Sequence, residues 1–184
     1  RLGTGPEQVQ TCTWTSAQPD FNRKDIVDTL ADSPDYTVSA CWARTHESPE
    51  WLAAQLDLCA ETIGTEVGVA SWTIPMGESW TGTAEHKADL VSGRVNAGSG
   101  QKQLADGYSL SLMDAAQKTN VRLTAAAGAH VVGRRLPRAT SSITLATVRG
   151  RPLPLPSADT VIAAMVSAWN PLQVVLSINP VNRL

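Results

Sequence analysis

The sequence predicts an α/β (α+β) fold, a two-layer sandwich in which a mixed sheet of about five to seven strands packs on about three or four helices. Segments with the spacing of strands and of helices alternate over roughly the first seventy residues and again near the C-terminal end. The 184 residues, 42% hydrophobic and 17% charged, suffice for one core, so we expect a single domain over residues 1–184. No apolar run approaches the roughly 18 residues of a membrane span, so we expect no transmembrane segment in this chain.

The first strand is predicted over residues 8–15, which are rich in threonine and carry Trp14. Asp20 follows a Gln-Pro turn and can cap a short helix whose apolar residues recur at helical spacing. An interior strand is predicted over residues 36–44, because both alternating sets of side chains are apolar or small.

A second helix should begin at Ser48-Pro49-Glu50, where a capping hydroxyl precedes a proline and an acid in the first turn. Its apolar face should pack on the sheet, and Gly64 is expected to end it. A third strand is predicted over residues 66–74, before a proline. The helix residues expected to be buried are Leu52, Leu56 and Cys59.

The middle of the chain is less regular. Residues 76–107 are polar and rich in glycine, which predicts a flexible loop or lobe in which only residues 84–91 suit a short helix. Residues 110–119 fit a helix and a strand about equally, and we favour a helix. Strands are predicted over residues 121–136 and 142–149, with Gly128, Gly133 and Gly150 as interruptions or ends.

The C-terminal part again has clear signals. Residues 151–156 lack three backbone donors because every second residue is proline, so we expect an extended connector or an edge. A last helix begins at Ser157 and Asp159 and ends at Asn170-Pro171. The last strand, residues 172–178, should have one face on the core.

Charge is distributed unevenly along the chain. Residues 1–67 carry eleven acids and four bases, whereas residues 115–158 carry seven bases and no acid. The functional interpretation is an anion-facing surface made by the arginines, because a guanidinium can bind an anion through two hydrogen bonds. The structural interpretation is that acidic helices and basic strands face each other, or that the charges are simply solvated. The candidate binding residues are Arg134, Arg135, Arg138, Arg149 and Arg151.

Trp80 is a further candidate binding residue. It has no apolar periodicity around it, which suits an exposed contact at an interface, and the alternative is packing over the core. Nucleic acid is a less favoured partner, since no aromatic residue between Tyr108 and Trp169 could stack on a base.

The inventory of catalytic groups is thin. The chain has no G-x-S-x-G, no phosphate-binding loop motif and no histidine pair at metal-ligand spacing, so we expect no metal or cofactor and lean against an enzyme. The weak catalytic candidates are a Ser79/Lys118 pair and His46, which follows a strand and precedes a capped helix. His46 could also pair with a cysteine nucleophile.

The three cysteines do not identify the cellular compartment of the protein. Three buried thiols are favoured over a disulfide between Cys12 and Cys41, which would need neighbouring strands and would suit an exported protein. The chain begins without methionine, which indicates a removed segment or an excised domain, and the localisation leans to extracytoplasmic or particle-associated.

The sequence thus favours a non-catalytic interaction or assembly domain, such as the soluble part of a larger envelope or particle protein. A protein partner or self-association is expected, with an anionic surface as a further option. The alternatives are a hydrolase with its site near His46 or Ser79, and an RNA-binding or capsid-type protein.

Overall fold

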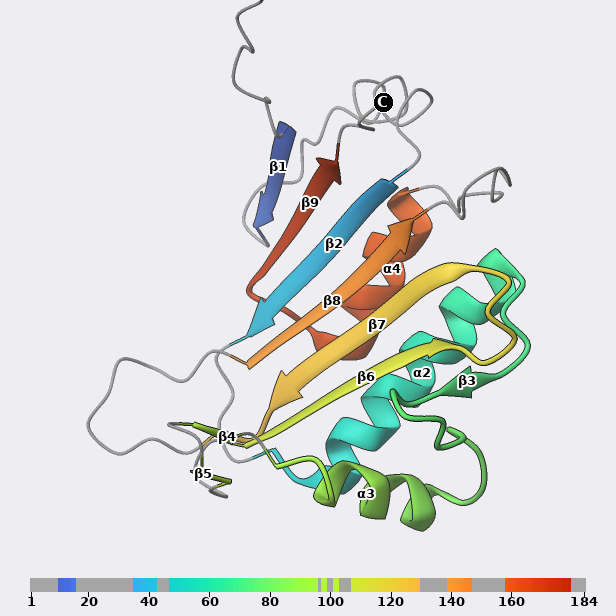
Figure 1. Cartoon of the computed structure of the whole chain (residues 1–184). Coiled ribbons are helices and arrows are strands. Elements are labelled where there is room, and N and C mark those ends of the chain that lie inside the picture. The colour runs from blue at the N-terminus through green and yellow to red at the C-terminus, as the bar shows by residue number, and fades with distance from the viewer. Residues whose placement is uncertain are drawn as a thin grey trace, which may run out of the picture.

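The computed structural model describes residues 10–15, 35–42, 47–95, 97–98, 101–102, 107–129, 139–146 and 158–179. In this part of the chain the fold is α+β, with three helices and two antiparallel sheets (Figure 1). The predicted helix after Asp20 and the proline-rich connector 151–156 lie outside the described residues.

The main sheet has seven strands in the order β1-β9-β2-β8-β7-β6-β3. Its strands are β1 (Gln10–Thr15), β2 (Asp35–Trp42), β3 (Trp72–Thr73), β6 (Tyr108–Asp114), β7 (Asn120–Ala127), β8 (Ala139–Ala146) and β9 (Gln173–Asn179). A second, two-stranded sheet consists of β4 (Ala97–Gly98) and β5 (Gln101–Lys102).

The sequence predicts a mixed sheet, and this prediction is wrong for the described strands. Every described pair of neighbouring strands is antiparallel. Two features explain the difference. A tight turn joins β6 to β7, and a short connection of this kind pairs strands antiparallel. The long connection through the second predicted helix leads from β2 to β3, which pairs with β6 and not with β2.

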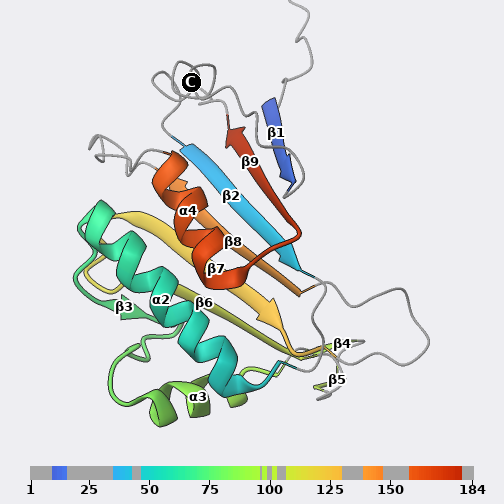
Figure 2. The same cartoon turned by 180° about the vertical axis from the view of Figure 1, so that it is seen from behind.

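The three helices are α2 (Pro49–Val67), α3 (Ala84–Ser92) and α4 (Ala158–Trp169). Helices α2 and α4 lie on the same face of the main sheet, and α3 packs beside α2 (Figure 2). We call α2, α3 and α4 together the helical side. None of the described helices has the length and apolarity needed to cross a bilayer.

Helix α2 begins as predicted and ends later than predicted. The hydroxyl of Ser48 accepts a hydrogen bond from the backbone N–H of Trp51 and caps the helix. Gly64 lies inside the helix, and the left-handed cap is Gly68, with φ 74°. The predicted burial of Leu52, Leu56 and Cys59 is confirmed, since all three have no exposed area.

Residues 110–119, predicted as a helix, contain a strand and a turn instead. In β6 the residues Leu110, Leu112 and Asp114 alternate toward the interior, which is the period of a strand. The buried Asp114 carboxylate accepts hydrogen bonds from three backbone N–H groups of the following turn, at 2.8–2.9 Å, and so fixes the hairpin. The predicted strand over 66–74 is reduced to β3, because the helix continues to Val67.

The core lies between the sheet and helices α2 and α4. Its aromatic centre is formed by Trp42 of β2, Trp51 of α2 and Trp169 of α4. The rings of Trp42 and Trp169 are stacked with centroids 4.9 Å apart, and Trp51 meets the edge of Trp169 at 5.9 Å. Stacked and edge-on pairs of this kind add specific geometry to apolar burial, so they fix α4 against β2.

Candidate functional site

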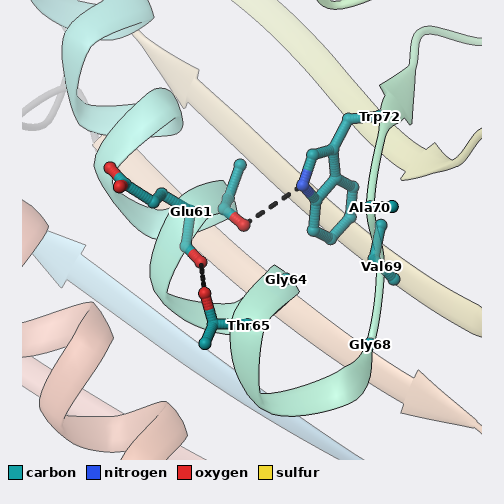
Figure 3. Close-up of a pocket in the computed structure, with 8 residues that line it drawn as sticks. Glu61, Gly64, Thr65, Gly68, Val69, Ala70 and Trp72 are labelled. Carbon is teal, nitrogen blue, oxygen red and sulfur yellow. Dashed lines mark hydrogen bonds between the residues drawn. The ribbon is translucent and has the colours of Figure 1, made fainter.

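A shallow hollow lies at the C-terminal end of α2, beside β3 (Figure 3). Its volume is about 440 Å³. The lining residues are Ala60, Glu61, Gly64, Thr65, Gly68, Val69, Ala70 and Trp72.

Close contact between helix and strand shapes the floor of this hollow. The indole N–H of Trp72 donates to the carbonyl of Ala60 at 3.1 Å, and the N–H of Val69 donates to the carbonyl of Gly64 at 2.9 Å. A β-carbon on Gly64 would lie 2.9 Å from the Val69 carbonyl oxygen, so only glycine allows this approach. The glycine thus has a packing role and does not terminate the helix.

Small and apolar residues form most of the lining of the hollow, and Glu61 and Thr65 are its polar members apart from the Trp72 indole. Its lining includes no histidine, cysteine or base, and the hydroxyl of Thr65 already donates to the carbonyl of Glu61 at 2.9 Å. In Figure 3 the Glu61 carboxylate points away from the Trp72 ring, toward the outer surface of α2. Glu61 is the one lining residue with an ionisable side chain.

The helical side carries a strong excess of negative charge. The three helices contain seven acids and one base, Lys87. Lys87 is paired, since its Nζ lies 2.6 Å from both carboxylate oxygens of Asp57. The acids are Glu50, Asp57, Glu61, Glu66, Glu85, Asp89 and Asp159.

The C-terminal end of α2 concentrates this charge. The carbonyl end of a helix carries a partial negative charge, which basic side chains usually offset. The last turn of α2 has no basic residue, and the exposed Glu61 and Glu66 stand near that end. Both acids add negative charge near this end of the helix.

The predicted catalytic residues do not form a site in the described part of the chain. Ser79 is exposed and forms an isolated bridge with Thr73. Lys118 is exposed in the β6–β7 turn, and its backbone N–H donates to Asp114. Among the residues that the structure describes, no hydrogen bond or ion pair joins the Ser79 and Lys118 side chains, and His46 lies outside them.

Trp80 is only 4% exposed, so it packs over the core, which is the alternative to an exposed contact residue. Its indole N–H donates to Asp57 at 3.0 Å, and the Lys87 ammonium lies 5.7 Å from its ring centroid. Asp57 on α2 and Lys87 on α3 thus hold the tryptophan between the two helices. The glycine-rich segment 76–107, predicted as a flexible loop or lobe, therefore contains a packed tryptophan and helix α3.

The disulfide between Cys12 and Cys41 is excluded by the strand order. Strand β9 lies between β1 and β2, with Cys12 opposite Leu176 and Cys41 opposite Gln173. The two cysteines are therefore on strands that are not neighbours, and Cys41 and Cys59 are free. Burial raises the pKa of the Cys59 thiol to about 12, although the hydrogen bond from the indole of Trp169 lowers it, so the thiol is inert.

The predicted arginine surface remains a prediction. Arg134, Arg135, Arg138, Arg149 and Arg151 all lie outside the described residues. Within the described part, Arg122 is exposed on β7, and Arg94 forms an ion pair with Glu78.

Glu47 is a buried acid whose role the sequence does not reveal. Its carboxylate accepts hydrogen bonds from the indole N–H of Trp42 at 2.8 Å and from the backbone N–H of Gly128 at 2.9 Å. The side chain joins the end of β2 and the start of α2 to the residue that follows β7. Its neighbour His46 suggests catalysis, but the carboxylate has structural partners on both oxygens.

Comparison of the chain with protein-family models, curated proteins and solved structures finds no match. Within the described residues, no three His, Cys, Asp or Glu side chains gather as a metal site.

Proposed function

We propose that this chain is a non-catalytic interaction and assembly domain whose anionic helical side binds a cationic surface of its partner. The observation that carries the proposal is the charge of the helices, with seven acids, a single base that is already paired, and two uncompensated acids near the end of α2. Complementary charge of this kind mainly steers the encounter and fixes the orientation of two proteins.

The sequence itself provides a suitable partner surface. Arg134, Arg135 and Arg138 stand in a segment without acids, so the arginines of one copy can meet the helical side of the next. This contact joins two different surfaces, and repeating it from copy to copy produces a chain or a ring. The hollow beside Trp72 offers room for one guanidinium next to the negative end of α2.

The test uses two variants that each neutralise one surface. Glu61→Gln/Glu66→Gln removes charge from the end of α2, and Arg134→Gln/Arg135→Gln/Arg138→Gln removes charge from the arginine segment. Sedimentation velocity at low salt and low protein concentration should show assemblies larger than a dimer for the wild type, and no species larger than a dimer for each variant alone. An equimolar mixture should form one-to-one complexes that do not grow, because each variant retains one surface.

The matched control is Glu50→Gln/Glu85→Gln, which removes two charges from the first turns of α2 and α3. This control should still assemble, with a modest loss from weaker steering. Growth beyond a dimer should also disappear near 1 M salt, where the screening length falls to about 3 Å. A wild-type protein that does not grow beyond a dimer at low salt, or variants that each grow beyond a dimer alone, would refute the proposal.

A further inference from the structure

None of the described elements covers the face of the main sheet opposite the helices (Figure 1). On this face the described side chains of β2, β6 and β9 are half-buried, while their neighbours along each strand are buried against the helices. The two faces therefore differ in burial, and the described residues of the face opposite the helices are not part of the core.

The strand register places residues of this uncovered face in rows that run across the sheet. The middle row follows the backbone register from Thr13 through Val175, Ser39 and Ser142 to Thr124 and Ser111. Its described side chains, Val175, Ser39, Thr124 and Ser111, are uncharged, and three of the four carry a hydroxyl group. A hydrogen bond between the side chains of Ser111 and Thr124, at 2.9 Å, links two neighbours of this row.

The two flanking rows have similar composition. One contains Ser177, Thr37 and Thr144 in succession, and it ends in Arg122 and Met113. The other contains Cys41 and Thr140 between Gln173 and Ala126. Arg122 is the only charged residue in the three rows, so the face is nearly neutral. We call these three rows the hydroxyl face.

A hydroxyl group both donates and accepts hydrogen bonds, whereas a carboxylate only accepts and an ammonium only donates. A surface of serine and threonine can therefore form hydrogen bonds with a copy of itself. A two-fold symmetric contact needs this property, because the same patch must serve both subunits. The helical side lacks it, since two anionic surfaces repel each other.

We infer that the hydroxyl face is a self-association surface, on which a second copy of this chain packs sheet against sheet around a two-fold axis. The charge of the molecule favours this occupant, because the contact leaves both anionic helical sides facing outward. Small side chains also let two sheets approach closely.

The area of the hydroxyl face can be compared with the area that a stable interface buries. With strands about 4.8 Å apart and residues about 3.4 Å apart, three rows over six strands cover roughly 600 Å². A standard interface buries about 800 Å² on each partner. We therefore expect a weak dimer whose population rises with protein concentration.

This contact is independent of the charged contact proposed above, and salt separates the two. Near 1 M salt the charged contact is screened, whereas the hydroxyl face, with Arg122 as the one charged residue of its three rows, depends little on salt. Sedimentation equilibrium of the wild type at 1 M salt should therefore show a monomer–dimer equilibrium. A wild type that is monomeric at the highest concentration reached would overturn the inference, whatever it does at low salt.

The variant Ser39→Lys/Thr124→Lys places like charges in the middle row and should weaken the dimer by more than about 100-fold. The control Ala54→Lys adds a charge on the exposed surface of α2 and should leave the dimer intact. Thermal unfolding confirms that both variants are folded. A folded Ser39→Lys/Thr124→Lys protein that still dimerises would exclude the hydroxyl face as the contact.

A second measurement needs no change in the face itself. In a Cys12→Ser protein, Cys41 on the hydroxyl face is the reactive thiol, because Cys59 is buried. The rate of Cys41 alkylation at 1 M salt should fall several-fold as the protein concentration passes through the dimerisation range. A rate that does not change while the dimer forms would place the interface elsewhere.

Discussion

The carboxylate of Glu47 accepts a hydrogen bond from the backbone N–H of Gly128 at 2.9 Å, although 81 positions separate the two residues. The same carboxylate accepts the indole N–H of Trp42 at 2.8 Å. One acid thus ties together β2, the start of α2 and the end of β7, and each of its two buried oxygens accepts a hydrogen bond.

Replacing Glu47 by alanine should destabilise the fold by about 2–4 kcal/mol, because two buried N–H donors lose their acceptor. Glu47→Gln should cost less, since one oxygen still accepts while the amide group opposes the second donor. Urea unfolding measures both. Glu61→Ala, an exposed acid, should change the free energy of unfolding by no more than about 0.5 kcal/mol. Equal losses for Glu47→Ala and Glu61→Ala would contradict this role.

Gly128 and Gly68 provide a matched pair of glycines. Both have positive φ, 76° for Gly128 and 74° for Gly68. A β-carbon added to Gly128 would lie 2.7 Å from the Glu47 carbonyl oxygen, whereas a β-carbon added to Gly68 would meet no described atom within 4 Å outside its chain neighbours. Gly68→Ala should therefore cost about 1 kcal/mol for its backbone conformation alone. Gly128→Ala should cost clearly more, at least about 2 kcal/mol. Similar midpoints of urea unfolding for the two variants would show that the contact at Gly128 can relax.

The sequence predicts most helices and strands, and its errors have physical causes. Gly64 and Gly68 are both plausible ends of α2, and only the approach of Val69 and Trp72 shows that Gly64 is a packing glycine. In β6, Leu110 and Met113 are three residues apart and favour a helix, although the buried Asp114 completes the alternation of a strand.

The candidate site is harder to predict than the fold. Trp80 is buried between α2 and α3, where its indole N–H donates to Asp57 and Lys87 pairs with the same acid. The sequence alone does not show that Asp57 and Lys87, which belong to two different helices, are in contact. The charge of the acidic helices is visible in the sequence, whereas the hydroxyl face needs the register of the strands. Strands distant along the chain, such as β9 and β2, contribute neighbouring positions of one row.

Leu56 and Leu58 test the orientation of α2. Leu56 has no exposed area, whereas Leu58 is 43% exposed. Leu56→Ala should reduce the free energy of unfolding by about 2–5 kcal/mol. Leu58→Ala should reduce it by about 0.5 kcal/mol or less. Denaturant titration of the two variants gives the comparison, and a larger loss at Leu58 would mean that α2 packs on the sheet with another face.

Met76 stands in a turn that favours glycine. Its φ is 81°, it follows Pro75, and the N–H of Gly77 donates to the carbonyl of Ile74 at 3.0 Å. The side chain is 88% exposed, so no packing offsets the unfavourable backbone. Met76→Gly should therefore stabilise the protein by about 0.5–1 kcal/mol, while Met76→Leu should have little effect. A lower thermal midpoint for Met76→Gly would mean that the methionine makes a favourable contact in solution.

Cys59 should make stability depend on pH in the alkaline range. Burial raises the pKa of its thiol from 9.0 to about 12. Below pH 9 the thiol is neutral in both the folded and the unfolded chain, so its contribution to stability is complete. Above pH 9 the unfolded chain loses this proton while the folded chain keeps it, so stability falls by up to about 1.4 kcal/mol for each pH unit until about pH 12.

Cys59→Ala removes this dependence, and comparison with the wild type isolates it from other groups. Burial also raises the pKa of Tyr36, which adds a further loss of stability at higher pH in both proteins. The difference in free energy of unfolding between wild type and Cys59→Ala should therefore shrink as the pH rises from 9 toward 11. Urea unfolding at several pH values measures this difference. If the two curves run parallel, the thiol is ionised as easily in the folded protein as in the unfolded chain, and Cys59 is not held in a closed core.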